Sequence, residues 1–282
     1  MRTPEFMIDT ANLDDVEKVW DKLTKAGVEP SSLRGITTNP NALAKINCNS
    51  IRDFEITVYK LTHFLTRCGA KQATLHVQMP RSSMSNNELD MWVAYIKQLG
   101  DGRTKLTMKV SPYTRTLEQL RAAGIYSIIP LNVTGVADAA TALRCFTHPV
   151  NYVSIIPGRM EEVGIDASAH LKMLDQRYTY PRGTAGGGRL ITGSMRTVAG
   201  LRRALDHNNI PTIGTRVWDA MTDMDYLGFA GPWWDCAPFE PDYLGDIPFI
   251  DQRNVDLTQQ FFFQMDELGK PLYDEFVSKQ CK

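Results

Sequence analysis

The chain has 282 residues, with 31 basic and 32 acidic side chains and a formal net charge of −1. This balance gives no electrostatic reason to expect nucleic acid or an anionic membrane as a partner, and the apolar runs are shorter than the roughly 18 residues of a membrane span. The length suits one (β/α)8 barrel, which typically has about 250 residues.

The cysteines are odd in number and widely spaced, at Cys48, Cys68, Cys145, Cys236 and Cys281. They form no CxxC pair and no zinc-like cluster with the scattered histidines, so we expect a reduced, cytoplasmic protein without a structural metal. Residues 1–6 are polar and lack the apolar region of a signal peptide. We interpret them as an expression leader or a disordered leader before a start at Met7.

The first half of the chain alternates β-rich runs with helical patterns. We predict a strand at 6–9, a helix at 13–23, a strand at 33–38, helices at 41–46 and 51–65, a strand at 73–79, a helix at 88–99, a strand at 106–111 and a helix at 117–123. The helix at 13–23 carries apolar Val16, Val19 and Leu23 at helical spacing, and Asn12 is a suitable N-cap.

The second half continues the same alternation. We predict a strand at 126–131, a helix at 136–145, a strand at 152–156, a helix at 167–176, a strand at 189–192, a helix at 198–207 and a strand at 212–214. Eight strands with intervening helices indicate right-handed parallel crossovers, and closure into a single TIM barrel over residues 7–221 is the favoured fold. A doubly wound open sheet is the alternative, although no glycine-rich fingerprint follows the first strand.

Two stretches depart from this repeat. Residues 181–188 are rich in glycine and predict a flexible connector rather than a phosphate loop. Residues 222–282 form a C-terminal, aromatic-rich extension that ends in a predicted helix at 257–279 with three consecutive phenylalanines, Phe261, Phe262 and Phe263. We expect this extension to pack on the barrel or on a neighbouring subunit.

Lys109 lies in the middle of an apolar strand, where an ammonium group is costly to bury unless it is paired or deprotonated. A neutral lysine is a nucleophile towards carbonyls, whereas an ordinary strand-end lysine reaches water. Other polar side chains occupy the predicted C-terminal ends of the strands, where barrel enzymes place their chemistry: Asp9, Thr38, Asn39, Gln78, Asn132, Thr134, Ser154, Arg159, Ser194 and Arg196.

Each of these residues also has a purely structural interpretation. Asp9 could cap a helix, Asn39 could form a turn before a proline, Thr134 could pack as a β-branched wall, and Arg159 and Arg196 could be solvated loop charges. Together, however, they predict an amine, a carboxylate, amides, hydroxyls and two guanidinium groups on one rim, which indicates a site.

Several segments resemble the transaldolase family, which includes the fructose-6-phosphate aldolases. They are IDTAN at 8–12, GITTNP at 35–40, MKV at 108–110, NVT at 132–134, VSIIPGR at 153–159 and SMR at 194–196. The resemblance covers residues 7–221 and does not extend to the aromatic tail.

The resemblance implies a class I aldol mechanism within the pentose phosphate pathway. Lys109 would form a Schiff base with the C2 carbonyl of a ketose phosphate, and Asp9 would be the general acid and base. Gln78 and Thr134 would hold a water, Thr38, Asn39, Asn132 and Ser154 would bind substrate hydroxyls, and Arg159, Arg196 and Ser194 would bind a phosphate. No metal or organic cofactor is implied, and the expected partners are sugar phosphates and other copies of the chain.

Two departures from the family pattern keep the reaction open. Transaldolases usually have a glutamate where this chain has Gln78, whereas the aldolase branch has a glutamine there. Where this chain has Ile156, the aldolase branch favours a tyrosine and many transferases have a phenylalanine. The leading hypothesis is a transferase that moves a dihydroxyacetone unit between sugar phosphates. The alternatives are an aldolase that releases dihydroxyacetone and, from another class, a barrel that binds sugar phosphates without turnover.

Overall fold

The computed structural model describes residues 4–99, 104–177, 188–206, 209–230 and 252–280. Eight parallel strands close into a barrel in sequence order, and β8 pairs with β1. The strands are β1 (Phe6–Asp9), β2 (Leu33–Thr37), β3 (Thr74–Gln78), β4 (Lys105–Val110), β5 (Leu131–Val136), β6 (Tyr152–Ile155), β7 (Arg189–Thr192) and β8 (Ile210–Gly214). The prediction of a (β/α)8 barrel is therefore confirmed.

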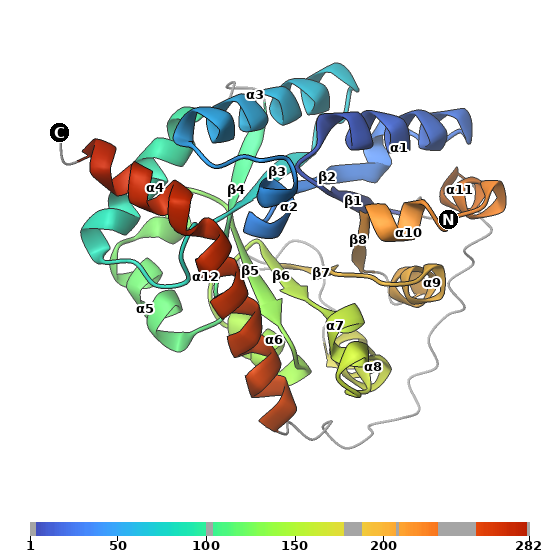
Figure 1. Ribbon diagram of the computed structural model, residues 1–282. Helices are drawn as coiled ribbons and strands as arrows, with labels where there is room; N and C mark the ends of the chain where they lie inside the picture. The colour runs from blue at the N-terminus through green and yellow to red at the C-terminus, as the bar shows by residue number, and fades with distance from the viewer. Residues whose placement is uncertain (1–3, 100–103, 178–187, 207–208, 231–251, 281–282) are drawn as a thin grey trace.

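Helices surround this barrel (Figure 1). They are α1 (Leu13–Lys25), α2 (Pro40–Lys45), α3 (Ile51–Arg67), α4 (Asn86–Leu99), α5 (Thr114–Ala122), α6 (Ala139–Phe146), α7 (Pro157–Glu162), α8 (Ala167–Arg177), α9 (Val198–Asp206), α10 (Thr215–Trp218), α11 (Asp223–Ala230) and α12 (Gln252–Gln280). Within the described ranges, no helix combines the length and the apolar character needed to cross a bilayer.

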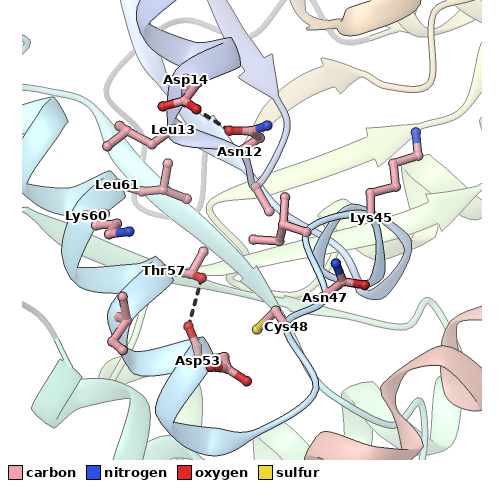
Figure 2. Close-up of a pocket in the computed structure, with 13 residues that line it drawn as sticks. Asn12, Leu13, Asp14, Lys45, Asn47, Cys48, Asp53, Thr57, Lys60 and Leu61 are labelled. Atoms are coloured by element: carbon pink, nitrogen blue, oxygen red, sulfur yellow. Dashed lines mark hydrogen bonds between the residues drawn. The ribbon is translucent and has the colours of Figure 1, made fainter.

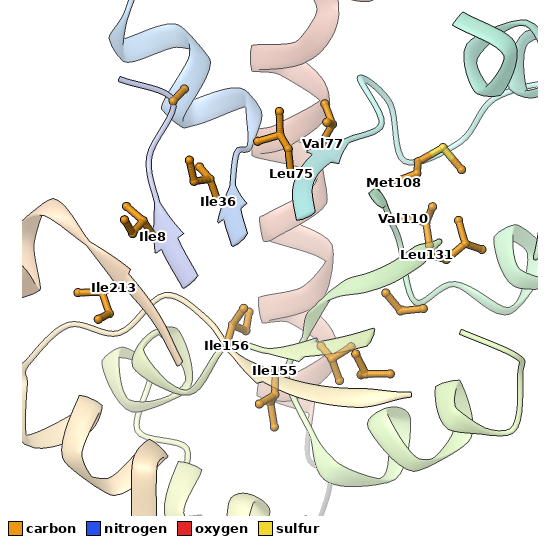
Figure 3. Close-up of a cluster of buried hydrophobic side chains, with 14 of the residues drawn as sticks. Ile8, Ile36, Leu75, Val77, Met108, Val110, Leu131, Ile155, Ile156 and Ile213 are labelled. Atoms are coloured by element: carbon orange, nitrogen blue, oxygen red, sulfur yellow. The ribbon is translucent and has the colours of Figure 1, made fainter. Parts of the chain in front are cut away.

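Alternation along the strands produces two different cores. Ile8, Ile36, Leu75, Met108 and other outward-facing strand residues pack in the layer between the barrel and its helices (Figure 3). Side chains of opposite parity point into the barrel. There, a small apolar cluster of Met7, Ile191 and Ile210 lies against Tyr152.

The fifth strand was predicted at the wrong place. Residues Ile125–Ser127 form a 3-10 turn instead, and β5 begins at Leu131, directly after Pro130. The apolar side chains of Ile125 and Ile129 are buried by the turn rather than by a sheet. The alternation of the true strand is interrupted because the pairing of β5 with β6 shifts register between Val133 and Val136, with Gly135 at a φ of 72°.

Other element boundaries differ less. The structure adds α7, α10 and α11, which were not predicted, and α12 begins five residues before the predicted start at 257. The predicted connector at 181–188 lies outside the described residues except for Gly188. The division of the chain into a leader, a barrel and an extension stays a prediction, although β1 begins at the fully buried Phe6.

The C-terminal helix α12 crosses the barrel and contacts β5 and the helices α2, α3 and α7 (Figure 1). Its polar side chains bind the loops that follow the strands. Asn254 Nδ2 donates to Ala137 O at 2.6 Å, and Asp266 accepts hydrogen bonds from the backbone and side chain of Ser82. Phe262 lies over Gly135, where an added Cβ would come within 2.7 Å of its ring.

At the opposite end of the barrel, Glu5 pairs with Arg34 on β2 and with Arg189 on β7. The Glu5 side chain is only 10% exposed. Since residues at the N-terminal face of such barrels mainly stabilise the fold, we interpret this cluster as structural.

Candidate active site

Lys109 is the buried centre of the candidate site. It points into the barrel from β4 and is 5% exposed. Its Nζ donates to Thr37 Oγ1 at 2.9 Å and to Thr38 O at 2.8 Å, so the amine reaches across to the end of β2. The amine is therefore buried inside the barrel and does not reach water as an ordinary strand-end lysine would.

Lys109 and Asp9 affect each other's charge. Burial lowers the pKa of Lys109 to about 8, and the Asp9 carboxylate opposes this change. Burial also raises the pKa of Asp9, against the combined attraction of Lys109, Arg196, Lys45 and Arg159. One carboxyl group is thus surrounded by cations at the barrel mouth, and burial shifts the pKa of both Asp9 and Lys109 in favour of the neutral form.

Strand register aligns Gln78 and Asn132 with Lys109. Gln78 pairs with Lys109 between β3 and β4, and Lys109 pairs with Asn132 between β4 and β5. Gln78 Oε1 is buried without a hydrogen-bond partner among the described residues. A buried amide oxygen without a partner is costly, so its place beside the lysine suits a bound water or substrate.

Ser154 and Thr134 belong to the same interior layer. Ser154 Oγ donates to Asn132 Oδ1 at 2.8 Å, and Thr134 is buried on β5. The Ser154–Asn132 contact joins two of the residues that the resemblance assigned to the substrate hydroxyls. Their catalytic and binding roles stay predictions.

The residues after β2 have structural roles as well. Thr38 Oγ1 donates to His76 O at 3.2 Å. Asn39 is the N-cap of α2, since its Oδ1 accepts from the Ala42 amide at 2.9 Å. The structural interpretation of Asn39 as a turn residue therefore holds. Its side-chain Nδ2 takes no part in the cap.

The predicted phosphate-binding side chains lie after β6 and β7. Arg159 belongs to α7, and its guanidinium lies 5.0 Å from the centre of the Phe261 ring on α12. Arg196 Nε donates to Glu162 Oε1 at 2.8 Å. Burial lowers the pKa of Arg159, followed by repulsion from Arg196. Two guanidinium groups that repel each other in this way favour a shared anion.

The backbone brings the two arginine segments into contact. An added Cβ at Gly158 would lie 2.0 Å from Ser194 O, so only glycine permits this approach. Ser194 itself has a φ of 55°, a left-handed conformation that is rare for serine. The predicted VSIIPGR and SMR segments therefore meet as one unit at the rim.

The structure adds residues that the sequence analysis missed. Thr37 binds the amine directly, Lys45 acts electrostatically on Asp9, and His76 contacts Asn132 inside the barrel. His76 lies two residues before Gln78 on the same face of β3. That period-two spacing is a signal in the sequence that could have found it.

A separate cavity of about 450 Å³ lies between α1, α2 and α3 (Figure 2). Its lining includes Asn12, Asp14, Lys45, Asp53 and Lys60. Lys109, Gln78 and Asn132 do not line this cavity, so it is not the candidate site. Among the described residues, no three His, Cys, Asp or Glu side chains gather as metal ligands.

No family model matches the chain. Among curated proteins, it is similar to a "Probable transaldolase" of Desulfotalea psychrophila, 30% identical over 168 residues that cover 58% of this chain and 65% of that protein. A "Probable transaldolase" of Brachyspira hyodysenteriae is 25% identical over 61% of this chain and 69% of its own length. One from Clostridium kluyveri is 29% identical over 62% and 69%.

The match with the Desulfotalea protein spans slightly less than two thirds of that protein's length. Among solved structures, the chain is similar to an orotidine 5′-monophosphate decarboxylase from Methanocaldococcus jannaschii, with 7% identity, a TM-score of 0.48, and coverage of 84% of this chain and 100% of that chain. A likeness at this level carries no conclusion about function. In sequence the chain is thus similar to several probable transaldolases, and the resemblance to the transaldolase family predicted from its motifs is confirmed.

Proposed function

We propose that this protein is a transaldolase-type transferase that moves a dihydroxyacetone unit between sugar phosphates through a Schiff base on Lys109. The observation that carries the proposal is the buried Lys109 amine, whose pKa is lowered to about 8 and which interacts electrostatically with Asp9. A lysine with a depressed pKa beside a carboxyl group is suited to covalent catalysis on a carbonyl.

The reaction begins when neutral Lys109 attacks C2 of a ketose phosphate. Loss of water leaves an iminium ion, which acts as the electron sink. Asp9 then removes the proton of the C4 hydroxyl, directly or through a water, and the C3–C4 bond breaks. The aldose phosphate leaves, and the three-carbon unit stays on Lys109 as an enamine.

The second half reverses these steps with another aldose phosphate. The enamine carbon attacks the new aldehyde, Asp9 returns the proton to the resulting alkoxide, and water hydrolyses the iminium ion. Arg159 and Arg196 would hold the phosphate of either aldose, since planar guanidinium groups can each bind two phosphate oxygens. Gln78 and Thr134 would hold the water.

A second candidate is a dihydroxyacetone-releasing aldolase. It is favoured by Gln78, which is a neutral amide at the position where transaldolases usually carry a glutamate. The two reactions share the imine and differ in the fate of the enamine. Incubation with fructose 6-phosphate alone separates them, because sustained release of free dihydroxyacetone supports the aldolase.

Borohydride trapping tests the proposal. Reduction in the presence of fructose 6-phosphate or dihydroxyacetone, followed by peptide mass mapping, should attach the three-carbon unit to Lys109. Lys105, the exposed first residue of β4, is the internal control and should stay unlabelled. Labelling elsewhere, or full turnover by Lys109→Ala, would contradict the mechanism.

The phosphate site has its own test. Arg196→Ala should raise KM for phosphorylated substrates at least tenfold, while the reaction of unphosphorylated dihydroxyacetone changes little. Arg203→Ala is the matched control, because Arg203 lies on the neighbouring α9, has a side chain that is 43% exposed, and pairs with Glu161. Equal effects of Arg196→Ala on both kinds of substrate would remove its phosphate role.

A further inference from the structure

A continuous chain of buried hydrogen bonds crosses the barrel interior beneath Lys109. His76 on β3 is fully buried, with Nε2 2.7 Å from Thr74 Oγ1 and Nδ1 3.0 Å from Asn132 Nδ2. Asn132 Oδ1 accepts from Ser154 Oγ at 2.8 Å. At the other end, the Thr74 side chain is hydrogen-bonded to Tyr152, whose ring centre lies 4.8 Å from that of His76.

The chemistry of the amide fixes which atom donates and which atom accepts in each of these hydrogen bonds. A carboxamide nitrogen can only donate, so His76 Nδ1 must accept from Asn132 and carry a lone pair. The ring proton is then on Nε2 and is donated to Thr74 Oγ1. The ring is neutral, because burial and the nearby Lys109 lower the pKa of His76 to about 3.

These bonds use two of the four hydrogen-bonding capacities of the Asn132 side chain, one lone pair of the oxygen and one N–H. The carbonyl oxygen accepts from Ser154, and one N–H is donated to His76. The second N–H remains for another acceptor. Asn132 is the register neighbour of Lys109, so any substrate bonded to that lysine lies close to this amide.

We propose that His76 is a positioning residue, which holds the Asn132 carboxamide in the single orientation that leaves its second N–H free to donate to a substrate oxygen at Lys109. The inference rests on the proposed function. An imidazole suits the task because its two nitrogens can accept and donate at once without adding a positive charge that would oppose the iminium ion. A flipped amide would require the other tautomer and would reverse every bond from Ser154 to Thr74.

The tautomer of His76 can be measured independently of catalysis. In ¹⁵N-histidine-labelled protein, long-range ¹H–¹⁵N spectra distinguish a protonated Nε2 from a protonated Nδ1. The His76 signals are assigned by their loss in His76→Phe. We expect the neutral Nε2–H form throughout pH 5–8. An Nδ1–H tautomer or an imidazolium ion in this range would overturn the proposal.

Kinetics then test whether the orientation matters to the reaction. His76→Phe keeps the volume of the ring and removes the acceptor, so kcat/KM should fall by roughly 10- to 100-fold. His76→Asn places an amide oxygen near the position of Nδ1 and should recover most of that loss. In an Asn132→Ala background, His76→Phe should add no further loss, because its effect passes through Asn132.

A buried histidine elsewhere is the matched control. His170 on α8 is 3% exposed, and its Nδ1 accepts from the Ala139 amide at 3.1 Å. His170→Phe should change thermal stability without changing kcat/KM. If His76→Phe does not fold, the His76 signals are assigned by their loss in His76→Asn, and the tautomer of the wild-type protein still decides the question.

Failure of this inference is distinct from failure of the proposed function. If borohydride does not label Lys109 in the wild-type protein, the proposed reaction is wrong, whatever the tautomer of His76. If Lys109 is labelled and His76→Phe retains wild-type kcat/KM, the positioning role is wrong and the reaction stands. Additive losses in the double variant would also contradict a role exerted through Asn132.

Discussion

Two opposing electrostatic effects act on the amine of Lys109. Removal from water disfavours the ammonium form, whereas the Asp9 carboxylate favours it, and the resulting pKa is about 8. At pH 7 about one amine in ten is then neutral, compared with about one in three thousand at the ordinary lysine pKa of 10.5. Burial therefore accounts for the larger fraction of neutral Lys109 amine, and Asp9 limits how far the pKa of Lys109 falls.

Asp9→Asn separates these two effects. Loss of the carboxylate should lower the pKa of Lys109 further, so the pH midpoint of borohydride trapping with dihydroxyacetone should move downwards. Turnover of ketose phosphates should fall by roughly 100-fold or more, because the proposed general acid and base is removed. Trapping across pH 5–10 and a coupled turnover assay measure the two outcomes.

Asp14→Asn is the control for this experiment. Asp14 lies in the first turn of α1, after the same strand, and should leave both the midpoint and the turnover unchanged. An unchanged or raised midpoint in Asp9→Asn would show that Asp9 does not act on the amine.

The individual residues of the site differed in how far the sequence could predict them. Asp9, Gln78 and Lys109 were accessible because each is a polar side chain at the end of a short apolar strand. His76 and Thr37 were not accessible from the sequence. An error of one position in a strand reverses which side chains face the barrel interior, and a histidine inside a strand has an equally good structural role. Only the closed barrel shows that both touch the site.

At the scale of elements, α12 links the aromatic tail to the rim of the barrel. Phe261 is buried against the Arg159 guanidinium, and Gln264 Oε1 lies 3.5 Å from Arg159 Nη1. Phe263, two residues after Phe261, is 73% exposed. The three phenylalanines that the sequence marked as a packing stripe therefore have different environments.

Phe261→Leu should loosen Arg159 without emptying the core at α12. Since a cation–π contact is worth about 0.5–1 kcal/mol, KM for phosphorylated substrates should rise roughly two- to fivefold. KM for unphosphorylated dihydroxyacetone should stay the same. Steady-state kinetics with both substrates measure the difference.

Phe263→Leu is the matched control and should change neither KM nor Tm. A similar rise for phosphorylated and unphosphorylated substrates in Phe261→Leu would mean that the ring supports the whole mouth rather than Arg159.

Elements were predicted well where local pattern and tertiary structure agree, and poorly where they differ. The helix 13–23 agreed with α1 because the N-cap, the first-turn acids and the apolar spacing all favour it. The fifth strand failed because the strong β-formers at 126–129 pack as a turn, while Gly135 interrupts the real strand. For α12, the sequence predicted an apolar face but contained no local signal for the loops it contacts.

At the scale of the whole molecule, the two ends of the barrel perform separate tasks. The polar rim with Lys109 lies at the C-terminal ends of the strands, and the Glu5 cluster lies at the N-terminal ends. Glu5 binds arginines from β2 and β7, on either side of the closure between β1 and β8. Mutations at the N-terminal end should therefore change the stability of the barrel, and mutations at the C-terminal rim should change its catalytic activity.

Glu5→Gln should destabilise the fold without affecting catalysis. Removing the anion leaves Arg34 and Arg189 without their shared partner, and we expect a loss of about 2–4 kcal/mol in the free energy of unfolding, given their partial exposure. The kcat should be unchanged below the melting transition. Denaturant unfolding and steady-state kinetics check both statements.

Glu17→Gln is the surface control for this variant. The Glu17–Arg67 pair is 42% and 59% exposed, so its loss should cost at most about 1 kcal/mol. Equal destabilisation by the two variants, or a fall in kcat for Glu5→Gln, would contradict a purely structural role for the cluster.

The contacts of α12 also set an order of assembly. Its Glu275 accepts a hydrogen bond from the amide of Ile51, 224 residues earlier, and its Asn254 binds the carbonyl of Ala137. Pairings this distant in sequence form late, after nearer segments have collapsed. During synthesis the eight strands would leave the ribosome before their cover, so a nascent barrel would expose an unfinished rim until the final helix arrived.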